Sequence, residues 1–283
     1  MICWMNGQFM EQQELRISPF DHGFLYGLGF FETFRTYKGK IPLLEEHYRR
    51  LSNTLAEYRI QMPFTEQELL KIVEELVRRN GGEDGYFRVN VSAGEADIGL
   101  APTFYDKPTA IVFQKALVVS PRGTEKAAHW LNTPRNSPEG SERTKGHSYG
   151  NNVLARFELP SLAQTEGIFV TRFGVVAEGI TSNIFWVRQG VLYTPSLSTG
   201  ILNGITRRIV LQLVEELQLE VREGEFFAED VERADEVFVT NAIQELVPIS
   251  HIGKVQFAGA AGDYYRRLHN AYIFMLQQRI EGE

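Results

Sequence analysis

The first 120 residues carry strand-like and helix-like hydrophobic patterns in turn. Hydrophobic side chains alternate over 30–37 and 86–93, which predicts strands. Between these stretches they recur at helical spacing over 44–58 and 69–76, which predicts two amphipathic helices. Thr65 and Glu68 form a capping-box pattern before the second helix. The order strand, helix, helix, strand is typical of an α+β domain.

A second arrangement begins after Pro121-Arg122-Gly123, where we expect the chain to divide into a small domain, 1–120, and a large domain, 121–283. Strands are predicted at 167–171, 182–187 and 191–194, and a buried-type strand at 235–240, with amphipathic helices over 206–217 and 265–276. The predicted fold class is therefore α/β, with an α+β small domain and an α/β large domain.

Charge and cysteine content exclude several function classes. The net charge of -7 argues against nucleic-acid binding, which favours a basic surface. Cys3 is the single cysteine, which excludes an internal disulfide, and no metal-binding motif is present. We see neither a signal peptide nor an apolar stretch long enough for a membrane span. A cytoplasmic protein without metal, nucleic-acid or membrane partners is expected.

The stretch EGSERTKGHSYGNNVLAR contains Lys145, the first candidate for chemistry. The lysine stands just ahead of a short apolar run, 153–155, and no Asp or Glu follows it at helical spacing. A lysine without a carboxylate partner in a packed region has a depressed pKa or extends to solvent. The neutral amine is the form that attacks an aldehyde, as Schiff-base chemistry requires. The alternative is an ordinary solvated lysine.

Three further features suit a phosphorylated, ring-containing cofactor. Glu178, on a turn beside a strand, could bond a pyridinium nitrogen, or be a solvated glutamate. Gly204-Ile205-Thr206 opens a predicted helix, whose free N–H groups could hold a phosphate, or serve as an ordinary helix start. Arg50 on the first helix suits phosphate, although neighbouring Arg49 shows that surface arginines are common here.

The joint order of these features resembles the fold-type IV family of pyridoxal phosphate enzymes. The matching residues are HYRRL, Lys145, EGITSNIF and GILNGITRR, and the resemblance runs from SPFDHGFLYGLGFFETFR to TNAIQELVPI. It implies two α/β domains with pyridoxal 5'-phosphate between them, in a homodimer whose small domains complete the partner's site. The resemblance implies that Lys145 is the Schiff-base lysine and that Glu178 is the partner of the pyridine nitrogen. It implies that Arg50 binds the phosphate, together with the backbone amides of Ile205 and Thr206. It also implies that Tyr149 approaches the phenolic oxygen and that Asn241 is a cofactor-binding residue.

Within that family the chain is most similar to the aminodeoxychorismate lyases of Bacillus-type bacteria. It has Asn241-Ala242 at a strand end where many aminotransferases have a Ser/Gly-Thr pair. It has Ala93-Gly94 where D-amino acid aminotransferases have an Arg-Gly pair that holds the substrate carboxylate. One departure is Gly27-Leu28-Gly29, where many members have Gly-Asp-Gly.

The resemblance implies elimination of pyruvate from 4-amino-4-deoxychorismate, giving 4-aminobenzoate for folate biosynthesis. Lys145 is then the base at the amine-bearing carbon and a candidate acid for the leaving group, a role that a hydroxyl could share. The substrate's carboxylates require cations, for which Arg35, Arg88 and Arg143 are unranked candidates. The alternatives are a D-amino acid or branched-chain aminotransferase with the same cofactor residues, and a cofactor-binding protein without enzymatic activity.

Overall fold

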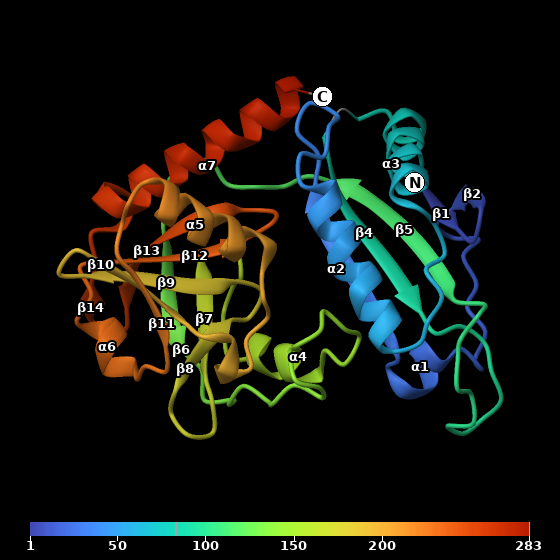
Figure 1. The fold of residues 1–283 in the computed structure, drawn as a ribbon, viewed down its shortest axis with the longest axis horizontal. Coiled ribbons are helices and arrows are strands. Elements are labelled where there is room, and N and C mark those ends of the chain that lie inside the picture. Colours follow the sequence, from blue (N-terminus) through green and yellow to red (C-terminus); the bar gives the residue numbers. More distant parts are fainter. Residues whose placement is uncertain (83, 283) are drawn as a thin grey trace. The chain divides into compact units, whose positions relative to one another are not determined.

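The computed structural model describes residues 1–82 and 84–282, which form two compact units (Figure 1). The first unit contains Met1–Val118 and Thr144–Ser148, and the second contains Val119–Arg143 and Tyr149–Glu281. A short segment from the middle of the chain is therefore part of the first unit. The domain division after residue 120 stays a prediction.

The first unit is built on an antiparallel sheet whose described strands have the order β2-β1-β5-β4-β3. Helix α2 packs against β3, and α3 packs against β1 and β5, so the apolar stripe of each helix enters the core. The elements are β1 (Ile2–Met5), β2 (Gln8–Glu11), α1 (His22–Tyr26), β3 (Gly29–Arg35), α2 (Leu44–Glu57), α3 (Glu66–Asn80), β4 (Gly85–Ser92) and β5 (Thr109–Ala116).

Both predicted helices of this unit are confirmed, and so is the capping box. The Thr65 hydroxyl accepts the N–H of Glu68 at 3.2 Å, while Glu68 Oε2 accepts the N–H of Thr65 at 2.7 Å. Helix α1 was not predicted, because its single turn is too short to show periodicity. Asp21 begins it by accepting the N–H of Gly23 at 2.7 Å, and Gly27 ends it at φ 69°.

The second unit contains a larger mixed sheet, with the order β11-β10-β9-β12-β13-β6-β7-β8 and β14 paired to β13 among the described residues. The pairs β10–β11, β13–β6 and β6–β7 are parallel. The elements are β6 (Lys126–Trp130), α4 (Gly150–Arg156), β7 (Thr165–Val170), β8 (Val176–Gly179), β9 (Asn183–Arg188), β10 (Val191–Pro195), η1 (Leu197–Thr199), α5 (Ile205–Glu216), β11 (Val221–Gly224), α6 (Ala228–Glu232), β12 (Glu236–Asn241), β13 (Glu245–Ile252), β14 (Val255–Gln256), η2 (Gly259–Ala261) and α7 (Asp263–Gly282).

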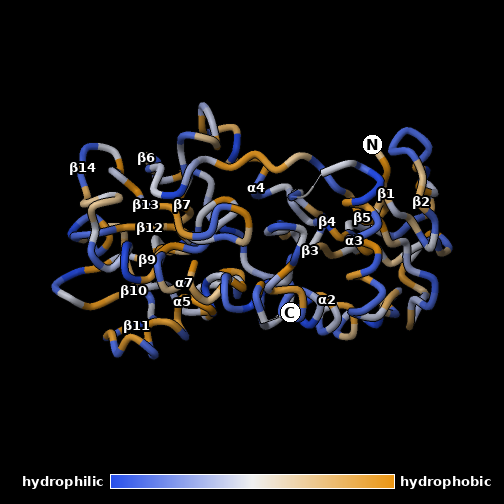
Figure 2. Tube along the Cα trace, turned by 90° about the horizontal axis from the view of Figure 1, so that it is seen from above, coloured by the Kyte–Doolittle hydropathy of each residue, from blue (hydrophilic) through white to orange (hydrophobic). Residues whose placement is uncertain are grey.

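The central strands of this sheet are buried on both faces, which explains their continuous hydrophobic runs. Ile184 and Trp186 of β9 join one core cluster, whereas Phe185 stacks on Phe238 of β12 at 5.3 Å between ring centroids. Phe238 also contacts Tyr265 of α7. Hydrophobic residues in β12 are orange in Figure 2. No helix in the described part of the chain is long and apolar enough to cross a membrane.

Candidate functional site

Lys145 lies in the first unit, on a segment that pairs with strand β3. Phe31 N–H donates to the carbonyl of Lys145 at 2.9 Å, and His147 N–H donates to the carbonyl of Gly29 at 2.8 Å. The bridge between Phe30 and Gly146 makes this pairing antiparallel. Because side chains alternate along a strand, Lys145 and His147 share the sheet face of Phe31. The apolar run that follows Lys145 is part of the short helix α4, which belongs to the second unit.

The Lys145 amine lies over an aromatic ring that also carries a second cation. Its Nζ is 4.7 Å from the Phe31 centroid, and Arg88 Cζ is 3.6 Å from the same centroid. Arg88 Nε donates to Asn90 Oδ1 at 3.2 Å, and His147 Nε2 lies 2.9 Å from that oxygen. Burial, followed by the charge of Arg88, lowers the pKa of His147 to about 4, so its ring is neutral at pH 7.

Arg50 is held by a buried carboxylate that the sequence reasoning did not single out. Arg50 Nε and Nη2 donate to the two oxygens of Glu32 at 2.7 and 2.6 Å, and His47 Nδ1 lies 2.7 Å from Glu32 Oε2. Burial raises the pKa of Glu32, but the Arg50 charge and the hydrogen bonds outweigh it and bring the pKa to about 2. His47 and Arg50 share one face of α2 at i and i+3, which was the available signal. The expected contact of Arg50 with phosphate stays a prediction.

Glu178, expected on a turn, is a buried residue of β8 in the second unit. Its Oε1 accepts from Arg135 Nε at 2.9 Å and lies 3.7 Å from Arg143 Nε. Its Oε2 accepts the backbone N–H of Leu202 at 2.9 Å and the amide of Asn183 at 3.4 Å. The alternative that Glu178 is a solvated glutamate is therefore wrong, because its carboxylate is buried and lies beside two arginines.

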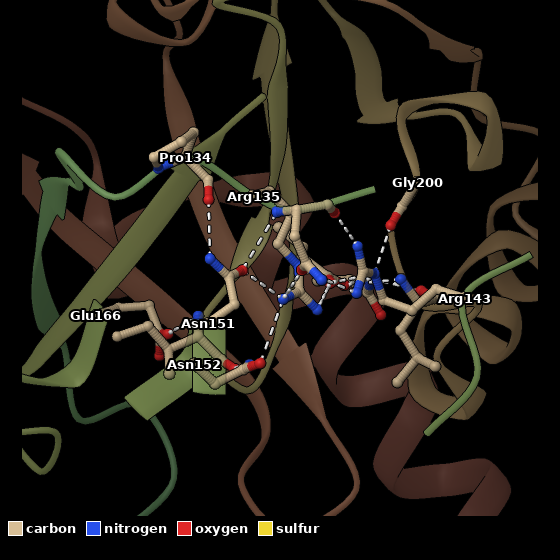
Figure 3. Close-up of polar contacts among 12 residues, drawn as sticks. Pro134, Arg135, Arg143, Asn151, Asn152, Glu166 and Gly200 are labelled. Carbon is tan, nitrogen blue, oxygen red and sulfur yellow. Dashed lines mark hydrogen bonds and ion pairs between the residues drawn. The ribbon is translucent and has the colours of Figure 1, made fainter. Parts of the chain in front are cut away.

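Arg135, which the sequence reasoning missed, connects Glu178 to helix α4. Figure 3 shows Arg135 beside Asn151 and Asn152 of that helix. Its Nη1 donates to side-chain oxygens of Asn151 and Asn152 at 2.9 and 3.2 Å, and the Asn152 amide donates to the carbonyl of Ile180 at 2.6 Å. Because Arg135 and Glu178 are 43 residues apart, no local pattern could have paired them. The result is a guanidinium fixed in orientation by the surrounding amides.

The start of helix α5 has the features of an anion site. Gly204 is the N-cap without a side-chain cap, and the first turn, Ile205–Arg207, contains no acidic residue. Thr206 Oγ1 is buried and has no hydrogen-bond partner. A Cβ on Gly204 would lie 2.1 Å from Asn183 Oδ1, so only glycine fits there. Uncapped N–H groups, the helix dipole and an unsatisfied hydroxyl together fit a phosphate group.

The remaining predicted residues of the second unit are Tyr149 and Asn241. Tyr149 is half-buried and directly precedes α4. Asn241 Oδ1 accepts the N–H groups of Ile243 and Gln244 at 3.0 and 2.8 Å, which closes the turn after β12. This use of its oxygen is structural, and the expected role of Asn241 in cofactor binding stays a prediction.

The candidate carboxylate-binding arginines differ in their surroundings. Arg143 donates to the carbonyls of Gly200 and Asn136, and burial followed by repulsion from Arg135 lowers its pKa to about 10. Arg35 stacks on Tyr37 at 4.4 Å. Arg88 is the candidate that shares a ring with Lys145. Arg143 is in the second unit and the other two are in the first.

Comparison with known proteins places the chain in a family. Residues 29–252 match the family model described as amino-transferase class IV. The aminodeoxychorismate lyase of Bacillus subtilis (strain 168) is 41% identical over 273 residues, covering 96% of this chain and 93% of that protein. The D-alanine aminotransferase of Bacillus licheniformis is 33% identical over 279 residues, covering 94% of each.

The fold gives the same assignment. The branched-chain aminotransferase from the archaeon Thermoproteus uzoniensis, solved with norvaline, matches with a TM-score of 0.87 and 26% identity, covering 98% of this chain and 95% of that one. The fold-type IV resemblance and the α/β class are confirmed by these matches. The chain belongs to the class IV aminotransferase family.

Proposed function

We propose that this protein is a pyridoxal 5'-phosphate-dependent 4-amino-4-deoxychorismate lyase that releases pyruvate and forms 4-aminobenzoate for folate biosynthesis. The observation that carries the proposal is the 41% identity to the Bacillus subtilis lyase over 96% of the chain, against 33% to a D-alanine aminotransferase. The alanine at position 93 also supports it, because an aminotransferase of D-amino acids is expected to have an arginine there.

The chain's own residues fit the cofactor. Lys145 would bond its aldehyde, Arg50 and the start of α5 with Thr206 would hold its phosphate, and Glu178 would pair with its ring nitrogen. When bound, the cofactor supplies an electron sink for the carbon that carries the substrate's amine. Glu178 would hold a proton at the ring nitrogen, and Arg135 fixes the position of the Glu178 carboxylate by pairing with its Oε1 at 2.8 Å.

The elimination requires removal of one proton from the substrate and cleavage of one carbon–oxygen bond. Lys145 removes the proton from the amine-bearing ring carbon, and the neighbouring carbon–oxygen bond to the enolpyruvyl group breaks. The ring becomes aromatic, and the leaving enolpyruvate takes up a proton to become pyruvate. Substrate and products contain the same atoms, so no oxidant or second substrate is needed.

The first test is release of pyruvate from enzymatically generated 4-amino-4-deoxychorismate, followed with lactate dehydrogenase. We expect pyruvate and 4-aminobenzoate in equal amounts. No pyruvate, but transfer of the amine of D-alanine or leucine to 2-oxoglutarate, would establish the aminotransferase alternative instead. The likeness of the fold to a branched-chain aminotransferase is the observation that favours this alternative.

The catalytic lysine has a matched control in the same unit. Lys145→Ala should abolish turnover and the visible absorbance that borohydride bleaches. Lys115→Ala should retain both, although Lys115 also lies over an aromatic ring, 4.1 Å from the Tyr86 centroid. Equal loss in the two variants, or an active Lys145→Ala, would remove Lys145 from the mechanism. An active protein without visible absorbance would exclude the cofactor.

We also propose a homodimer, as the family resemblance implies. Large hydrophobic side chains are exposed in the first unit, including Phe24 of α1 at 74%, Ile98 at 75% and Leu100 at 81%. The N–H of Gly99 donates to the Tyr26 hydroxyl at 2.7 Å, which ties this loop to α1. Such a patch is typical of an interaction surface. Sedimentation equilibrium should give twice the 32.3 kDa chain mass, and a monomer would refute the proposal.

A further inference from the structure

Strands β3 and β4 of the first unit, with the Lys145 segment bridged to β3, present a row of functional side chains on one face. Phe31 lies opposite Asn90 of β4 in the strand register, and it pairs on its other side with Lys145. Arg88 is two residues before Asn90, and His147 is two residues after Lys145, so both share this face. The Phe31 ring thus contacts both cations, with its centroid 4.7 Å from Lys145 Nζ and 3.6 Å from Arg88 Cζ.

A chain of hydrogen bonds fixes that guanidinium. Asn90 Oδ1 accepts from Arg88 Nε at 3.2 Å and, on its other side, from His147 Nε2 at 2.9 Å. The His147 ring lies directly on Gly29, where an added Cβ would be 2.3 Å from Nδ1 and Cε1. It also stacks on Phe31, with centroids 6.4 Å apart. His147 is therefore held against the strand, and its Nε2–H is directed at Asn90.

We propose that His147 is a positioning residue that acts through Asn90 to keep the Arg88 guanidinium over the Phe31 ring, where Arg88 binds a carboxylate of the substrate. This inference rests on the proposed function in one respect: the substrate must be an amine that carries a carboxylate and reacts at Lys145. Arg88 is favoured over Arg35, which lies four residues along β3 from Phe31, a distance of roughly 13 Å. Arg143 already serves the Glu178 cluster of the second unit.

The neutral state of the histidine suits this role. A protonated imidazole would place a second positive charge beside Arg88, whereas a neutral ring donates to Asn90 without repelling the guanidinium. Asn90 Oδ1 accepts from both donors, so loss of the imidazole N–H removes one of the bonds that fix the Asn90 amide beside the Arg88 guanidinium. Loss of the imidazole N–H should therefore act on the orientation of Arg88 more than on the chemical step.

The test is calorimetric binding of benzoate and of neutral benzamide to the cofactor-loaded protein. Wild type should bind benzoate more tightly than benzamide. Arg88→Met should raise the Kd for benzoate roughly ten- to hundredfold, as expected for loss of a hydrogen bond to a charged group, and so remove the preference. His147→Leu should weaken benzoate binding, whereas His147→Gln, which retains an N–H at a similar distance, should preserve it. Arg79→Met is the control, because Arg79 stacks on Phe9 at 4.4 Å on the surface of the same unit.

A double variant separates positioning from a purely structural effect. In Arg88→Met, adding His147→Leu should cost no further benzoate affinity, since the residue through which His147 acts is absent. In turnover, His147→Leu should raise KM more than it lowers kcat. The inference would be overturned if His147→Leu lowered benzoate affinity equally with and without Arg88. It would also be overturned if His147→Gln bound benzoate as weakly as His147→Leu, or if Arg88→Met retained the preference for benzoate. Absence of pyruvate formation with an intact benzoate preference would overturn the lyase proposal alone.

Discussion

Arg135→Met is the substitution with the largest predicted effect on the stability of the second unit. It removes the guanidinium that pairs with Glu178 and donates to three asparagine side chains, at a site where Arg135 and Glu178 are 9% and 4% exposed. Loss of one partner of a buried ion pair costs about 3–5 kcal/mol. We expect the lower end, about 3 kcal/mol, because Arg143 Nε is 3.7 Å from the same carboxylate oxygen. That corresponds to a fall in Tm of roughly 6–12 °C.

The assay is thermal unfolding of the cofactor-free protein by circular dichroism, so that cofactor loss does not contribute. The control is Arg222→Met, because Arg222 makes two hydrogen bonds to Glu220 at 3.0 and 2.7 Å with both side chains exposed. A solvated pair of this kind contributes little, and its Tm should change by less than about 2 °C. Adding Glu178→Gln to Arg135→Met should recover part of the loss, since no unpaired carboxylate then remains buried. Equal Tm values for Arg135→Met and the control would refute the reasoning.

Three further predictions concern the first unit. Gly29→Ala should lower the free energy of unfolding in urea by about 1–3 kcal/mol, because the new Cβ collides with the His147 ring. The control, Gly82→Ala, should not lower it, because no atom lies nearer than 3.8 Å to the new Cβ. Thr65→Ala should lower stability by about 1 kcal/mol through loss of the α3 cap, whereas Thr65→Ser should retain the urea midpoint. The folded-state pKa of Glu32, about 2, lies below its ordinary value of 4.5, so its stabilisation is complete above pH 4.5 and lost as the pH falls through 2. The stability difference between wild type and Glu32→Gln, about 3 kcal/mol at pH 7, should therefore shrink over that range in urea titrations; a difference independent of pH would contradict it.

The local elements of this protein follow from its sequence. Helices α2 and α3 and the Thr65 cap are determined by spacing and by residue types within a few positions, and these interactions persist in any fold that buries the apolar stripe. The start of α5 is also determined locally: Gly204 is the N-cap, and the first turn contains no acidic residue. The order of Arg50, Lys145, Glu178 and Thr206 was sufficient to indicate the family, because each belongs to a local motif.

What surrounds those residues was decided by the tertiary structure alone. Lys145 gains its neighbours from pairing with β3, more than a hundred positions earlier in the chain, and Glu178 gains Arg135 from a bridge across 43 residues. Strand register and ion pairing over such separations depend on how the sheets assemble, which hydrophobic periodicity does not encode. The sequence by itself therefore determined which residues are candidates and which helices carry them. Only the folded chain decided that Glu178 is buried, that Glu32 holds Arg50, and that Arg88 shares a ring with Lys145.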